Sequence, residues 1–131
     1  MSESIEKPVV LIVDDEPLIS ELLRTSLEDA GFSSLTASDA DGAIDLLDRD
    51  GAGFVGVVTD IDLGSARDGW DVARHARERN PAVAVVYCSG GSSHEWPVSG
   101  VPQSVILTKP FAAAQVVVAL SNLINGANPA A

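Results

Sequence analysis

Three segments decide the fold of this chain: VVLIVDDE (9–16), FVGVVTD (54–60) and SVILTKPF (104–111). Each is a short apolar run, rich in β-branched residues, that leads into charged side chains, a pattern typical of buried strands. Asp14 and Asp15 follow the first run, Asp60 ends the second, and Lys109 follows the third. If the runs are parallel strands of one sheet, these side chains meet at its carboxyl edge, where open α/β sheets bind ligands.

The three aspartates also predict the kind of ligand. Carboxylates gathered at one edge repel one another unless a cation lies between them. A ligand set made only of oxygen atoms suits Mg²⁺ better than zinc or copper. We therefore expect a magnesium site that involves Asp14, Asp15 and Asp60.

The length of 131 residues predicts one domain with a core of its own. We expect this domain to span 1–131, with an ordered core over about 8–126 and flexible tails at 1–7 and 127–131. This length leaves no room for an added output module. A hydrophobic content of 46% excludes a disordered chain.

Composition also limits the partners and the location. Nineteen acidic residues against eight basic ones give a net charge of −11, which argues against direct contact with nucleic acid. No apolar stretch approaches the roughly 20 residues that a membrane span needs, so we expect no membrane insertion. The single cysteine, Cys88, is expected to be a buried hydrophobic residue, and it fits a reducing, cytoplasmic location.

Strands and helices are expected to alternate along the chain. The predicted strands are Val9–Val13, Ser33–Ala37, Phe54–Thr59, Val83–Cys88 and Val105–Thr108. The predicted helices are 17–30, which carries Leu18, Ile19, Leu22, Leu23 and Leu27 at helical spacing, then Ala40–Asp48, Trp70–Arg79 and Ala112–Asn125. This order predicts an α/β fold, (βα)5, in which a doubly wound, five-stranded parallel sheet is covered on both faces. Glycine and proline interrupt the pattern over 89–103, so the fourth helix is expected to be short or irregular.

Four motifs then carry a resemblance that covers nearly the whole chain. They are Asp14-Asp15-Glu16, Asp60, Ser89 and Lys109-Pro110-Phe111, each at the end of a predicted strand. In this order and spacing they resemble the receiver domain of two-component response regulators, which has a flavodoxin-like fold. The length is similar to that of standalone, single-domain regulators. The resemblance implies a phosphorelay protein that catalyses only its own phosphorylation and dephosphorylation.

The resemblance implies a role for each site residue. Asp60 would accept a phosphoryl group from a histidine kinase, a phosphotransfer protein or a small phosphodonor, because carboxylates are competent nucleophiles. Asp15 and Asp60 would bind Mg²⁺ directly, Asp14 would bind it through water, and the backbone carbonyl of Asp62 would complete the protein ligands. The phosphorylated state would then control contact with a downstream protein.

Lys109 and Ser89 would act on the phosphoryl group itself. The resemblance implies that the Lys109 ammonium neutralises one phosphoryl oxygen and that the Ser89 hydroxyl donates a hydrogen bond to another. It also implies a cis peptide between Lys109 and Pro110.

Two departures from the family pattern bear on the switch. Gly64 stands where the family commonly has a proline, which predicts a more mobile loop around Asp62. Ile106 stands where the family often has an aromatic residue, so the usual rotating ring is absent. We therefore hypothesise that phosphorylation orders the 90–103 segment through Ser89.

Several alternatives stay open at this point. The chain could be a phosphate sink or shuttle, or a pseudo-receiver that binds partners without phosphorylation. The Asp60-Ile61-Asp62 triplet also resembles the Asp-x-Asp motif of aspartyl phosphatases. The apolar last helix, AAAQVVVALSNLI (112–124), suggests a homodimer. His75 and the basic cluster around Arg74, Arg77 and Arg79 are expected to form a solvated helix face.

Overall fold

The computed structural model describes residues 7–64, 66–91 and 96–126. Most of the expected tails, 1–6 and 127–131, lies outside these residues, and Lys7 is exposed.

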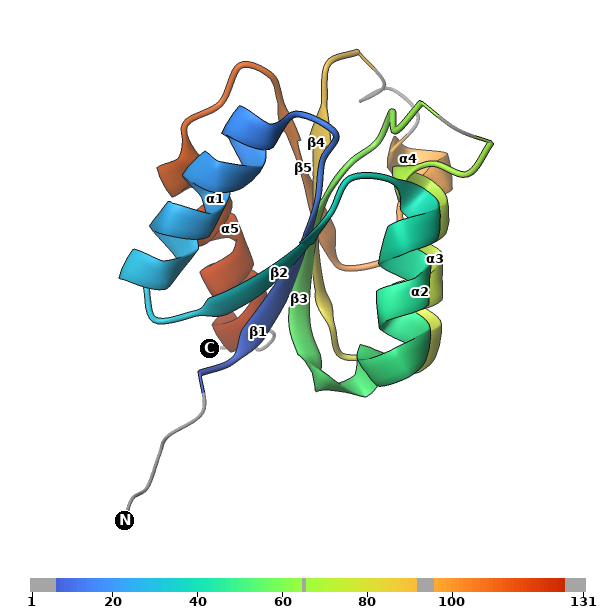
Figure 1. Ribbon diagram of the computed structural model, residues 1–131, viewed down its shortest axis with the longest axis horizontal. Helices are drawn as coiled ribbons and strands as arrows, with labels where there is room; N and C mark the ends of the chain where they lie inside the picture. Colours follow the sequence, from blue (N-terminus) through green and yellow to red (C-terminus); the bar gives the residue numbers. More distant parts are fainter. Residues whose placement is uncertain (1–6, 65, 92–95, 127–131) are drawn as a thin grey trace.

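Five strands form one parallel sheet in the order β2-β1-β3-β4-β5 (Figure 1). They are β1 (Val9–Val13), β2 (Ser33–Ala37), β3 (Phe54–Asp60), β4 (Ala84–Ser89) and β5 (Ser104–Thr108). The strand order reverses between β1 and β3, which is the topological switch point at which doubly wound sheets bind ligands. The predicted α/β fold is confirmed, with strand ends shifted by no more than one residue.

The helices cover both faces of the sheet. They are α1 (Pro17–Asp29), α2 (Ala40–Asp50), α3 (Gly69–Arg79), α4 (Trp96–Ser99) and α5 (Ala113–Gly126), with a 3₁₀ turn, η1 (Gly51–Gly53), after α2. Figure 1 shows α1 and α5 on one face and α2 and α3 on the other. Pro17 starts α1, where a missing N–H costs nothing, and Asp68 caps α3 in a reciprocal pair with Asp71. Among the described residues, no helix is long and apolar enough to cross a membrane.

The side chains of β1 alternate between two hydrophobic layers, as a strand buried on both faces requires. Val10 and Ile12 pack with Leu23, Leu27 and Leu120 beneath α1 and α5. Leu11 and Val13 pack in the layer beneath α2 and α3, with Leu47, Trp70 and Val72. These two layers hold the strand ends, and therefore the site, in fixed positions.

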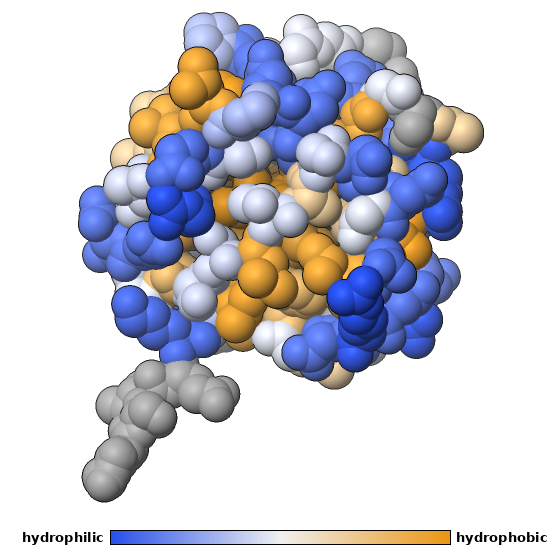
Figure 2. Space-filling model, in the orientation of Figure 1, coloured by the Kyte–Doolittle hydropathy of each residue, from blue (hydrophilic) through white to orange (hydrophobic). Residues whose placement is uncertain are grey.

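Helix α1 buries less of its apolar surface than its spacing predicts. Leu23 and Leu27 are buried, whereas the side chains of Leu18 and Leu22 are 84% and 55% exposed. Figure 2 shows apolar side chains at the surface on the side where α1 lies. The outer part of the predicted stripe is thus a surface feature rather than core.

The fourth helix is a single turn, Trp96–Ser99, as the glycines and prolines around it predict. Residues 96–104 are nevertheless fixed by contacts with α3 and β4. Arg77 of α3 donates to the backbone carbonyls of Pro102 and Gln103, and the Val101 N–H donates to the Tyr87 hydroxyl. The hypothesis that phosphorylation orders the 90–103 segment stays a prediction; residues 96–103 make these contacts in the unphosphorylated protein, and residues 92–95 lie outside the described part of the chain.

Candidate functional site

The ends of neighbouring strands bring the predicted side chains together. Asp60 is the last residue of β3, and Asp14 directly follows β1, where its N–H donates to the Ala37 carbonyl at the end of β2. On the other side, the Ile61 N–H donates to the Cys88 carbonyl of β4. The carboxyl ends of the strands therefore hold the site residues, as a parallel sheet predicts.

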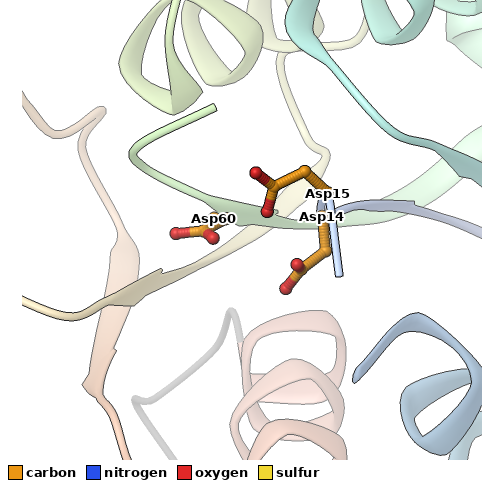
Figure 3. A group of neighbouring side chains, drawn as sticks. All are labelled: Asp14, Asp15 and Asp60. Atoms are coloured by element: carbon orange, nitrogen blue, oxygen red, sulfur yellow. The ribbon is translucent and has the colours of Figure 1, made fainter. Parts of the chain in front are cut away.

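Three carboxyl groups lie side by side at this edge (Figure 3). One carboxylate oxygen from each of Asp14, Asp15 and Asp60 lies within 4.8 Å of the others. Asp14 and Asp60 are 4% and 6% exposed, whereas Asp15 is open to solvent. The group offers oxygen ligands only, with one open side, which fits a Mg²⁺ ion that keeps some of its water.

Lys109 closes the site from the β5 side. Its ammonium nitrogen lies 3.1 Å from an Asp60 carboxylate oxygen and 3.6 Å from a Glu16 carboxylate oxygen. Its backbone N–H donates to the Ser89 carbonyl at 2.7 Å, which ties the end of β5 to the end of β4. The peptide between Lys109 and Pro110 is cis, as predicted.

The electrostatics favour a second cation beside Lys109. Burial raises the pKa of Asp60 and the charge of Asp15 adds to this, although Lys109 opposes both. Burial and the charge of Asp60 likewise raise the pKa of Asp14, against the hydrogen bond from the Glu16 N–H. The single ammonium thus leaves the carboxylates short of positive charge, and a divalent ion would relieve this.

Two predicted residues have surroundings that bear on their roles. Ser89 is 1% exposed, and its hydroxyl oxygen accepts a hydrogen bond from the Gly91 N–H at 3.1 Å. The Asp62 side chain is exposed in the β3–α3 connection and is not part of the three-carboxylate group. The contribution of its backbone carbonyl to metal binding stays a prediction.

Two residues that support the site received no role from the sequence. Glu16 holds Lys109, as described above. Gly69 lies against the backbone of Asp60, where an added Cβ would sit 2.2 Å from the Asp60 carbonyl oxygen and 2.7 Å from the Ile61 Cα. Helix α3 can therefore begin directly beside Asp60 only because this position has no side chain.

The fold and the site together define a class of protein. The chain belongs to the response regulator receiver domain family, whose model matches residues 10–121. Receiver domains are regulatory parts of two-component systems rather than conventional enzymes; they generally bind Mg²⁺ and interact with histidine kinases or phosphotransfer proteins.

Known relatives share both the sequence and the fold. The nitrogen assimilation regulatory protein NtrX of Azorhizobium caulinodans is 38% identical over 112 residues, which are 83% of this chain and 24% of that protein. A probable transcriptional regulatory protein of Mycobacterium tuberculosis, TcrX, is 32% identical over 117 residues, 88% of this chain and 49% of that protein. The chain thus spans at most about half the length of these two proteins.

Solved structures give the same family. A response regulator receiver protein from Sinorhizobium medicae has a TM-score of 0.88 and 43% identity, and the match covers 94% of this chain and 98% of that one. The receiver domain of NtrX from Brucella abortus has a TM-score of 0.74 and 30% identity, covering 89% and 98%.

Proposed function

We propose that this protein is a phosphorylation-controlled binding module in which Asp60 accepts the phosphoryl group. One observation carries the proposal. The buried Asp60 carboxylate lies between the Asp14 and Asp15 carboxylates on one side and the Lys109 ammonium, 3.1 Å away, on the other. This arrangement fits a carboxylate that receives an anionic group together with a divalent cation.

The bonds that form and break in the transfer are those of the Asp60 carboxylate and the phosphodonor. A carboxylate oxygen of Asp60 attacks the phosphorus in line with the leaving group. With acetyl phosphate the bond to the bridging oxygen breaks and acetate leaves with the electron pair; with a phosphohistidine the P–N bond breaks and the imidazole leaves. The Lys109 ammonium then moves from Asp60 to a phosphoryl oxygen, because formation of the acyl phosphate removes the carboxylate charge that the ammonium now faces.

Asp15 and Asp60 are the proposed direct ligands of Mg²⁺, with Asp14 binding through water and the Asp62 carbonyl as a further ligand. When bound, the ion would neutralise charge on the phosphoryl oxygens during transfer. Ser89 is proposed to turn its hydroxyl from the Gly91 N–H to the phosphoryl group. The end of β4 therefore has a different conformation in the phosphorylated protein than in the unphosphorylated one.

The surface beside the site suits a helical phosphodonor. Leu22 of α1, which is exposed, lines a hollow of about 230 Å³ whose walls include Lys109 and Phe111, and the exposed Leu18 lies one turn earlier on the same helix. An apolar face at the mouth of the site would let a histidine kinase or a phosphotransfer protein dock with its phosphohistidine directed at Asp60. We infer that phosphodonor proteins bind here.

A second surface suits self-association. Between Ser104 and Gly126 the only charged residue is Lys109, which lies in the site. Val105 and Leu107 of β5 and Val118 and Leu123 of α5 line a shallow apolar groove. In a protein with a net charge of −11, this neutral face is where two copies can meet without repulsion. We propose a homodimer through α5.

The test is intact mass after incubation with acetyl phosphate and Mg²⁺. We expect the wild type to gain one phosphoryl group, and Asp60→Ala, or the wild type with EDTA, to gain none. An equal gain in Asp60→Ala would overturn the proposal.

Whether the module signals or serves only as a phosphate sink or shuttle depends on a partner that prefers the phosphorylated form. No observation favours an aspartyl phosphatase.

A further inference from the structure

A buried aromatic side chain connects the site to the segment after α4. Tyr87 lies two residues before Ser89 on β4, so both side chains project from the same face of the strand. Tyr87 is 0% exposed, and its hydroxyl oxygen accepts a hydrogen bond from the Val101 N–H at 3.0 Å. Burial raises the pKa of Tyr87, so the phenol stays neutral in this position.

The connection continues beyond Val101. The Ser104 hydroxyl donates to the Val101 carbonyl at 2.6 Å and accepts from the Trp96 indole N–H at 2.9 Å. Val101 and Ser104 are 8% and 7% exposed, so water has little access to these groups. The first residue of α4 and the first residue of β5 are thus held to β4 through one chain of hydrogen bonds.

Helix α3 holds the same segment in a strained shape. Arg77 donates to the Pro102 carbonyl at 2.6 Å and to the Gln103 carbonyl at 3.1 Å. Gln103 has a φ of 57°, which is uncommon for a residue with a side chain. A strained residue persists only while its surroundings fix it, so loss of one contact would favour a different arrangement of 96–104.

The Tyr87 ring has a second link to the site. It packs on the Trp70 ring with a centroid separation of 4.7 Å, and Trp70 follows Gly69, which lies against the Asp60 backbone. Tyr87 is therefore connected to Ser89 along β4 and to the start of α3 through Trp70.

We propose that Tyr87 is the switch residue of this chain, and that its hydrogen bond to Val101 breaks when Asp60 is phosphorylated. This inference rests on the phosphoacceptor function proposed above. Ile106 of β5 has no aromatic ring, so the aromatic switch residue of this chain lies on β4 instead. The turn of Ser89 toward the phosphoryl group displaces the end of β4, and the Tyr87 hydroxyl moves out of reach of the Val101 N–H. Residues 96–104 then rearrange and change the surface around Val98, whose side chain is 89% exposed.

Amide hydrogen exchange of Val101, followed by NMR, tests the switch in the wild type and in Tyr87→Phe. Beryllofluoride with Mg²⁺ serves as the phosphoryl mimic. In the free wild type the Val101 amide should exchange slowly, and the mimic should accelerate it roughly five- to tenfold, as expected for loss of one hydrogen bond. In Tyr87→Phe, which keeps the ring and removes only the hydroxyl, exchange should be fast with or without the mimic.

Ser34→Ala is the matched control. It deletes a buried hydroxyl of β2 that has no hydrogen-bond partner among the described residues, so Val101 exchange should match the wild type. Equal exchange in the free wild type and in Tyr87→Phe, or a wild-type Val101 amide that ignores the mimic, would overturn the inference. If Tyr87→Phe does not fold, the wild-type comparison alone decides.

Phosphorylation measured by mass separates this inference from the function on which it rests. A protein that gains the phosphoryl group while Val101 is unchanged would refute the switch alone. A protein that gains none would refute both.

Discussion

The ionisation of the Cys88 thiol depends on its buried position beside the site. Its thiol is 1% exposed, and burial, with added repulsion from Asp60 and Asp14, raises its pKa to about 12. Its ordinary value is 9.0, so at pH 8.5 the thiolate fraction of the folded protein is roughly 1,000-fold lower than that of the unfolded chain. The prediction of an inert, buried cysteine follows from this environment.

Alkylation by iodoacetamide at pH 8.5 checks this, and we expect labelling in urea to be at least about 100-fold faster than in buffer. Above pH 9 the unfolded chain releases the thiol proton first, so the contribution of Cys88 to the free energy of unfolding decreases as the pH rises from about 9 toward 12. Similar labelling rates in urea and in buffer would contradict the buried position of Cys88.

Gly69 occupies a position beside Asp60 that leaves no space for a side chain. An added methyl group would meet the backbone of Asp60 and Ile61, which cannot move aside as a side chain could. We expect Gly69→Ala to lower the free energy of unfolding by about 1–3 kcal/mol and to slow phosphorylation by acetyl phosphate. Gly90→Ala is the control, because its added Cβ would meet nothing within 4 Å. Urea denaturation compares the two, and equal losses would show that Gly69 has no special position.

At the scale of elements, the sequence predicts most of the framework. The strands are identifiable because their apolar runs are short and end in charged or turn-forming residues. The same logic places Asp14, Asp15, Asp60 and Lys109 at one edge. The contacts of 96–104 are not predictable in this way, because Arg77 and Tyr87 reach backbone groups that lie far along the chain and leave no periodic signal. The sequence therefore predicts a solvated basic face on α3.

Two side chains of that face have partners that the sequence does not reveal. Arg77 donates to the carbonyls of Val83, Pro102 and Gln103. A His75 ring nitrogen lies 2.7 Å from an Asp48 carboxylate oxygen, which joins α3 to α2. The prediction of a solvated face is wrong for Arg77, and His75 is only partly exposed.

The Arg77 contacts should contribute measurably to stability. We expect Arg77→Met to lower the free energy of unfolding by about 2 kcal/mol, because hydrogen bonds from a charged donor to three carbonyls are lost. Arg49→Met is the control, since Arg49 is 70% exposed and pairs only with an exposed aspartate among the described residues. Chemical denaturation followed by circular dichroism measures both, and equal effects would show that the three Arg77 hydrogen bonds add no stability.

At the scale of the whole molecule, charge is distributed unevenly. Acidic residues outnumber basic ones at the site, in α1 and in α2, whereas α3 is slightly basic and β5 and α5 carry no charged residue. This asymmetry could be read from the sequence, but whether the neutral residues face solvent could not. The structure leaves Val118 58% exposed, so part of the apolar surface of α5 is not buried in the core.

Self-association through this face is testable by sedimentation velocity over a range of protein concentrations. We expect the wild type to form dimers at high concentration and Val118→Asp to remain monomeric, because a buried unpaired charge opposes the interface. Leu35→Asp is the control, since Leu35 is 48% exposed on the opposite edge strand, β2, and should leave the dimer intact. A wild type that stays monomeric, or a Leu35→Asp protein that also dissociates, would contradict the proposed face.

The central claim is that Asp60, among the carboxylates gathered at this edge, forms the acyl phosphate. Borohydride reduction of the protein after treatment with acetyl phosphate and Mg²⁺ converts a phosphorylated aspartate to homoserine, which peptide mass spectrometry locates. The account predicts homoserine at position 60 and unmodified aspartate at positions 14, 15 and 62. Homoserine at any of those three positions, or at none of the four while the protein gains phosphate elsewhere, would contradict it.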